Sequence, residues 1–141
     1  MAKKRASVHA SVKTHPDYWK TEWALRLAVF GTFLGHGVFA VMVKESWIHY
    51  FNAVGIPTSA AVILLPIIGV VDIMAAIIML VAPIRAVLIW AVFWGFTTAL
   101  IRPISGEPVW DFVERTANWG APLALLYIRG LPTNLKELFS S

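Results

Sequence analysis

Apolar residues run in four long stretches along this chain, separated by short segments rich in charged residues, glycine and proline. A helix needs about 20 predominantly apolar residues to cross the hydrocarbon core of a bilayer. The four stretches cover residues 23–43, 58–81, 84–101 and 113–131. The pattern therefore predicts an all-α polytopic membrane protein, with a four-helix transmembrane bundle over residues 23–131.

The segment between the first two stretches has a helical pattern of its own. Within residues 44–57, Trp47, Tyr50 and Phe51 recur at helical spacing, and Gly55 and Pro57 follow as stop signals. Aromatic side chains favour the boundary between hydrocarbon and water. We therefore expect a short interfacial helix in this first outer loop.

Small residues in the first stretch indicate how its helix packs. Gly31 and Gly35 are four residues apart and so lie on one face of a helix. In lipid, such pairs let two helix backbones approach closely. We interpret them as a packing surface within the bundle rather than as a dimerisation motif.

Composition supports the membrane interpretation. The 141 residues are 58% hydrophobic and only 14% charged, whereas soluble domains carry about 25% charged residues. The remaining segments are a basic tail at 1–22 and a short tail at 132–141. The chain has no cysteine, which excludes disulfides, iron–sulfur clusters and thiol chemistry within it.

The distribution of positive charge predicts an orientation. With four spans, both tails and the turn at 82–85 share one face, which then carries all but three of the 12 Lys and Arg residues. The exceptions are Lys44, Arg102 and Arg115. The positive-inside rule places the basic face, and hence both termini, in the cytoplasm.

Ionisable residues inside the predicted spans are the candidate functional groups. At mid-depth in the membrane such a side chain costs at least about 2.5 kcal/mol, so it needs a partner or a purpose. Asp72 is too deep to reach the interface, and we expect it to form a structural ion pair, with Arg26 reaching up or His36 reaching down. Snorkelling to the interface is the alternative for Arg26, and a protonatable or ligand-binding role is the alternative for Asp72.

A second polar group is expected in the outer half of the bundle. Helix rise places its members at similar depth, open to the outer side and closed below by aliphatic residues. The alternative to a ligand site is that the histidine only packs against its neighbours and that the charged loop residues are solvated. The candidate ligand-binding residues are His36, Asp72, Thr97, Thr98, Asn118, Arg102 and Glu114.

Several kinds of site are not supported by the pattern. A b-type haem usually needs two histidines on facing helices, and His36 is the single histidine within a predicted span. No histidine cluster predicts a metal centre and no catalytic triad is present. We expect no covalent cofactor, no catalytic residue and no nucleic-acid partner.

The first stretch also resembles a known family. Residues 26–37, with Arg26 followed by His36 and Gly37, are similar to the DoxX/DoxD-like family of small four-helix membrane proteins, and the resemblance covers roughly 23–131. It implies a compact four-helix bundle associated with membrane redox chemistry, as a small subunit of a quinone-linked complex. The expected location is the bacterial inner membrane.

Three functions remain open at this point. The first is an accessory, non-catalytic subunit of a redox assembly that holds quinone or lipid against His36, Asp72 and Asn118. The second is a small oligomeric, proton-coupled transporter that uses Asp72 as its titrating group. The third is a purely structural subunit of a larger membrane complex. Membrane lipid, and either a larger complex or further copies of this chain, are the expected partners.

Overall fold

The computed structural model describes residues 17–140, and every regular element in that range is a helix. Three helices are long: α2 (Tyr18–Val41), α4 (Thr58–Val81) and α5 (Arg85–Ile104). The short elements are η1 (Glu45–Trp47), α3 (Ile48–Ala53), α6 (Val109–Val113), α7 (Thr116–Arg129) and α8 (Leu135–Leu138). Residues 1–16, which make up most of the predicted basic tail, lie outside the described residues. Helix α2 begins five residues before the predicted span and so includes the end of that tail.

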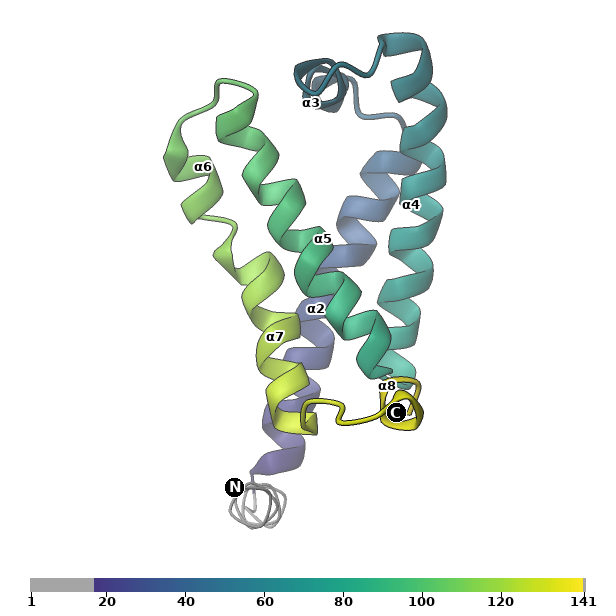
Figure 1. Ribbon diagram of the computed structural model, residues 1–141, viewed down its shortest axis with the longest axis vertical. Helices are drawn as coiled ribbons and strands as arrows, with labels where there is room; N and C mark the ends of the chain where they lie inside the picture. Colours follow the sequence, from purple (N-terminus) through teal and green to yellow (C-terminus); the bar gives the residue numbers. More distant parts are fainter. Residues whose placement is uncertain (1–16, 141) are drawn as a thin grey trace.

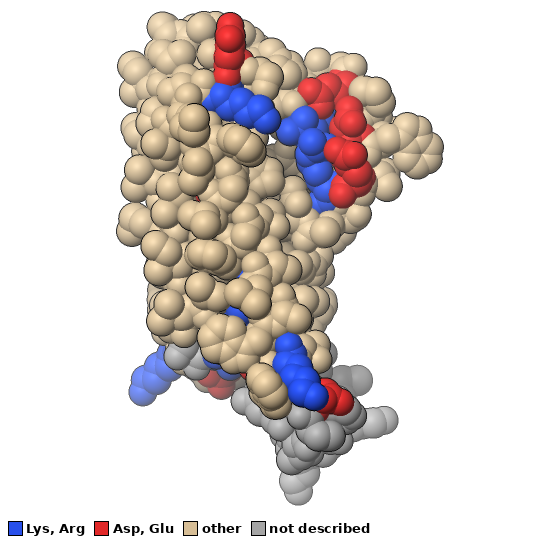
Figure 2. Space-filling model, turned by 180° about the vertical axis from the view of Figure 1, so that it is seen from behind, with Lys and Arg blue, Asp and Glu red and all other residues tan. Residues whose placement is uncertain are grey.

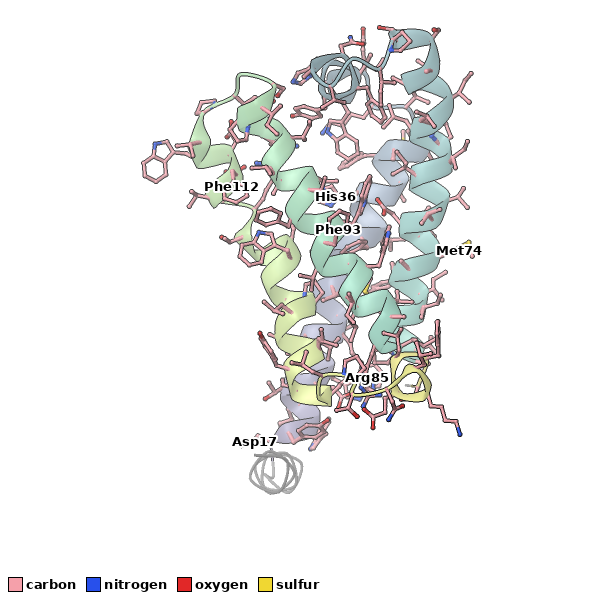
Figure 3. The ribbon with its side chains drawn as sticks, viewed as in Figure 1. Asp17, His36, Met74, Arg85, Phe93 and Phe112 are labelled. Atoms are coloured by element: carbon pink, nitrogen blue, oxygen red, sulfur yellow. The ribbon has the colours of Figure 1, made fainter. Side chains whose placement is uncertain are left out.

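The long helices α2, α4 and α5 are long and apolar enough to cross a membrane, which is consistent with an integral membrane protein. In α4 the apolar surface extends all round. Buried residues recur every three or four positions along α4 and form one face. Exposed apolar residues form the opposite face, where Ile63 is 65% and Val81 is 71% exposed. Met74 points outward from this helix (Figure 3). A helix that is apolar on both faces favours lipid as the solvent of the outer one.

The fourth predicted span is not one continuous helix. The chain turns at Glu114 and Arg115, between α6 and α7, and α7 has only 14 residues. At 1.5 Å per residue α7 is about 21 Å long, short of the roughly 30 Å hydrocarbon core. The predicted fourth span over 113–131 is therefore not confirmed, because a turn lies at its start and the helix that follows is short.

The helices pack as two pairs that meet at one core. Helix α2 runs along α4, α5 runs along α7, and α2 also contacts α7 (Figure 1). Their shared core contains Val29, Phe33, Met79, Leu88 and Leu125. The start of α2 and the C-terminal α8 lie at one end of the molecule, which we call the inner end, and α3 and α6 lie near the other, the outer end (Figure 1).

Glycines set the close contact between α2 and α4, but not the ones expected. A Cβ added at Gly37 would lie 2.8 Å from the carbonyl oxygen of Gly69, and one at Gly69 would lie 2.5 Å from that of Gly37. In contrast, a Cβ at Gly31 or Gly35 would meet no atom within 4 Å. The predicted packing role of Gly31 and Gly35 is therefore wrong, because that face of α2 is open.

The first outer loop contains the helix predicted for it. A short 3-10 turn leads into α3, and Gly55 ends the segment with a φ of +83°. That positive φ suits glycine because other residues rarely adopt it. The position of α3 at a membrane interface stays a prediction.

Candidate ligand-binding cavity

A cavity of about 300 Å³ lies in the outer half of the helices, between α2, α4, α5 and α7 and against α3. Small-molecule sites usually occupy about 300–1,000 Å³, so the cavity is at the lower limit. Its walls are mostly apolar and aromatic. Six of the seven predicted ligand-binding residues line it: His36, Asp72, Thr97, Thr98, Arg102 and Asn118. Whether they bind a ligand stays a prediction.

Asp72 is the buried carboxyl group of the cavity. It is 4% exposed and projects from the face of α4 that also carries Leu65 and Gly69. The Trp94 side chain from α5 faces the carboxyl group as a hydrogen-bond donor, whereas Oδ1 has no partner. Among residues 17–140 no Lys, Arg or His forms an ion pair with Asp72.

His36 enters the cavity from α2, in the half of the molecule near the outer end (Figure 3). Its Nδ1 lies 2.8 Å from the carbonyl oxygen of Thr32, one helical turn earlier. A carbonyl can only accept a hydrogen bond, so Nδ1 must carry the proton. In the neutral ring, Nε2 is then left as a hydrogen-bond acceptor.

The uncharged members of the polar group differ in how their hydrogen bonds are used. The hydroxyl groups of Thr97 and Thr98 donate to the carbonyls of Phe93 and Trp94 at 2.8 and 3.0 Å, so they retain only acceptor capacity. The side-chain amide of Asn118 makes no hydrogen bond within the described residues 17–140. Asn118 is therefore an uncharged donor available in the cavity.

The loop helix α3 covers the outer side of the cavity. Trp47, Tyr50 and Phe51 line the cavity, and the Trp47 ring stacks on the His36 ring with centroids 5.7 Å apart. Sequence reasoning placed these aromatic residues at the membrane surface and missed their role in the cavity wall. Trp94, which donates toward Asp72, was not among the candidate site residues either.

A hydrogen-bonded cluster joins α3 to the end of α5. The Tyr50 hydroxyl donates to Glu107 Oε1 at 2.6 Å, and Arg102 Nη1 donates to Glu107 Oε2 at 3.1 Å. The Arg102 guanidinium also lies over the Tyr50 ring, 4.8 Å from its centroid. Arg102 therefore pairs with Glu107 and not with Glu114.

The cluster shifts the ionisation of its own members. Burial, together with the hydrogen bond to Glu107, raises the pKa of Tyr50 to about 12. The same hydrogen bond, followed by the Arg102 guanidinium, lowers the pKa of Glu107 from its usual value. At neutral pH the cluster is therefore a neutral phenol and a carboxylate bound to a guanidinium.

Glu114 is the predicted site residue that lies outside the cavity. Its side chain is exposed and pairs with Arg115, which itself lines the cavity and donates to the Asp111 carbonyl at 2.7 Å. The chain turns at Glu114 and Arg115, between α6 and α7. Arg115 takes its place in the cavity wall.

Arg26 does not pair with Asp72. It lies near the inner end, where Nη2 is 2.5 Å from Glu22 Oε1 and Nη1 donates to the Leu80 carbonyl at 3.2 Å. Arg129 of α7 donates to the same Glu22 oxygen. The predicted Arg26–Asp72 ion pair is thus replaced by a Glu22–Arg26–Arg129 cluster, which the i, i+4 spacing of Glu22 and Arg26 could have indicated.

Residues 17–140 contain no group of three or more His, Asp or Glu side chains placed to hold a metal ion. A scan against models of protein families found no match. Neither a search of curated proteins nor a search of solved structures found a similar protein. The resemblance to the DoxX/DoxD-like family therefore stays a prediction.

Proposed function

We propose that this chain is a multi-pass protein of a bacterial inner membrane with both termini cytoplasmic. In this arrangement α2, α4 and α5 each cross the bilayer, and α6 and α7 cross together as a broken fourth span. Two observations support it. The start of α2 and the C-terminal α8 lie at the same end of the molecule (Figure 1), and charged side chains gather at the two ends, leaving a nearly uncharged band between them (Figure 2).

The proposed role is to hold a membrane-soluble ligand, quinone or lipid, as a small accessory subunit of a quinone-linked redox assembly. The observation that carries this proposal is the convergence of six of the predicted polar residues, from four helices, on one largely apolar cavity. An apolar pocket with few, well-placed polar groups is typical of small-molecule sites. The redox association itself comes from the family resemblance.

The hydrogen-bonding capacity of the cavity suits a ligand with both an acceptor and a donor. Asn118 and Arg102 can donate to a carbonyl oxygen, and Nε2 of neutral His36 can accept from a hydroxyl group. The ring of Trp47 supplies a flat apolar wall beside His36. A quinone in its reduced form offers the hydroxyl groups that such a histidine would bind.

Gentle extraction from the native membrane tests this proposal. We expect the purified chain to carry quinone or lipid, detectable by mass spectrometry of an organic extract, and His36→Ala to reduce the bound amount at least tenfold. His49→Ala is the matched control, because His49 is exposed and not part of the cavity wall. Protein without a bound small molecule, and equal quinone binding by the two variants, would contradict the proposal.

A proton-coupled transporter is a second candidate, favoured by the buried Asp72 with its unpartnered Oδ1. Four spans are few for alternating access, so this function would require an oligomer. It predicts a pH-dependent flux in liposomes that disappears in Asp72→Asn and persists in Asp111→Asn, whose carboxyl group lies outside the cavity. Absence of flux at any pH would dismiss it.

A further inference from the structure

A groove on the outer half of the molecule carries three cationic side chains. It runs beside α2 and shares one wall with the cavity. Figure 2 shows Lys and Arg side chains on either side of a hollow near the upper end. The cations of the groove are Lys44, Arg102 and Arg115, and no Asp or Glu is part of its lining.

These cations are only partly neutralised by their neighbours. The Lys44 ammonium lies over the rings of Phe39 and Trp47, at 4.6 and 5.2 Å from the centroids, and forms no ion pair within residues 17–140. Arg102 uses Nη1 for Glu107, whereas its buried Nε has no partner. Arg115 is paired with Glu114 on its exposed side. The groove therefore presents the Lys44 ammonium, which has no ion pair among the described residues, beside two arginines that are paired with Glu107 and Glu114.

The rest of the groove is lined by two glycines and two aromatic rings, together with Thr32, His36 and Asn118. Gly31 and Gly35 lie on the open face of α2, and both line the groove. Without side chains there, the surface of α2 forms a shallow channel that leads from the cations along the helix. A ligand that fits has an anionic head and an apolar tail.

We propose that this groove binds the phosphate headgroup of an anionic membrane phospholipid, with one acyl chain lying over Gly31 and Gly35. The arginines offer the planar, forked donors that match phosphate oxygens, and Lys44 adds a charge on a flexible stem. The inference rests on the proposed membrane location but not on a quinone in the cavity.

Lipid exchange into nanodiscs tests the inference, with binding of phosphatidylglycerol and phosphatidylcholine measured by native mass spectrometry. We expect the full chain to retain phosphatidylglycerol at least tenfold more than phosphatidylcholine. The double variant Lys44→Gln/Arg115→Gln should lose most of that preference. Lys44→Arg keeps the positive charge, so it should retain more of the preference than Lys44→Gln does. Lys20→Gln/Lys136→Gln removes equal charge at the inner end and should leave the preference intact.

Three results would overturn the inference. They are equal retention of the two lipids, an equal loss in the inner-end control, and displacement of the lipid by millimolar inorganic phosphate, which would indicate a site for free anions. Gly35→Leu provides an independent arm, because it fills the channel without changing charge and should also reduce retention at least threefold. If the chain fails to enter nanodiscs at all, the membrane location is wrong, which is a distinguishable outcome.

Discussion

The two ends of this molecule use the same side chains in opposite ways. At the inner end one carboxylate, Glu22, is shared by Arg26 and Arg129, and all three side chains are largely buried. Arg85 completes this end by donating to the carbonyls of Arg129 and Gly130 at 2.9 Å. Most donors there join the starts of α2 and α5 to the end of α7, although Arg129 Nε is buried without a partner.

The outer end also has a carboxylate bound to an arginine, but there the pair lies beside the cavity. Glu107 binds Tyr50 and Arg102, but Arg102 Nε, Asn118 and Lys44 keep donors that no protein group uses. The comparison shows that charge alone does not identify a site in a membrane protein. Unused hydrogen-bonding capacity beside a cavity separates a candidate binding region from a structural cluster.

The largest effect is expected from removing the shared carboxylate at the inner end. Glu22→Ala leaves Arg26 and Arg129 close together without their anion, and breaking a buried ion pair in this way costs about 3–5 kcal/mol. Unfolding in mild detergent, followed by circular dichroism, measures the loss. Glu114→Ala is the outer-end control and should cost under about 1 kcal/mol, because that carboxylate is exposed. Equal losses would remove the distinction between the ends.

A smaller effect is expected at the outer end, where the attachment of α3 can be weakened selectively. Tyr50→Phe removes the hydroxyl group that donates to Glu107 and should cost about 1.5 kcal/mol. Hydrogen exchange should accelerate in α3 while the inner half stays protected. Tyr127→Phe, on the exposed face of α7, should change neither measurement.

The contribution of the Tyr50–Glu107 hydrogen bond should depend on pH at both extremes. The pKa of Glu107 is lowered from 4.5, so its stabilising effect is present above pH 4.5 and is lost as the pH falls through the folded-state pKa. The pKa of Tyr50 is raised from 10.0 to about 12, so its effect is present below pH 10 and is lost between pH 10 and about 12. The stability difference between the unsubstituted chain and Tyr50→Phe should therefore be flat between these limits. A difference that changes near neutral pH would contradict this assignment.

The smallest effect is expected from His49, at the rim of the same cluster. Its Nε2 lies 3.4 Å from Glu107 Oε1 and its side chain is about half exposed. His49→Ala should lower the free energy of unfolding by less than about 0.5 kcal/mol, because exposed pairs are screened. A loss as large as that of Tyr50→Phe would mean that the rim, and not the phenol, attaches α3.

The sequence was most informative where one physical requirement dominates. A stretch of about 20 predominantly apolar residues must form a helix to satisfy its backbone in lipid, and the boundaries predicted for α4 coincide with those found. Estimates of depth along each helix also placed His36, Thr98 and Asn118 at one level, and all three line the cavity. Helix rise is nearly constant, so such estimates need no knowledge of packing.

The errors arose where the outcome depends on which helices are neighbours. Arg26 was assigned to Asp72 by depth, but Glu22 on its own helix and Arg129 from α7 lie nearer. Glycine spacing could not distinguish the packed Gly37 from the open Gly35, because that depends on helix rotation. The turn at Glu114 and Arg115 was visible as a polar interruption and was given too little weight.

The hydrogen bond between His36 and the Thr32 carbonyl has an electrochemical consequence for any redox-active occupant. A ring that accepts at Nε2 binds a hydroxyl group better than a carbonyl, so a quinol would be held more tightly than its quinone. Preferential binding of the two-electron-reduced form raises the midpoint potential by about 30 mV for each tenfold preference. A bound quinone should then be easier to reduce than the same molecule in the surrounding lipid pool, and His36→Ala should abolish the offset.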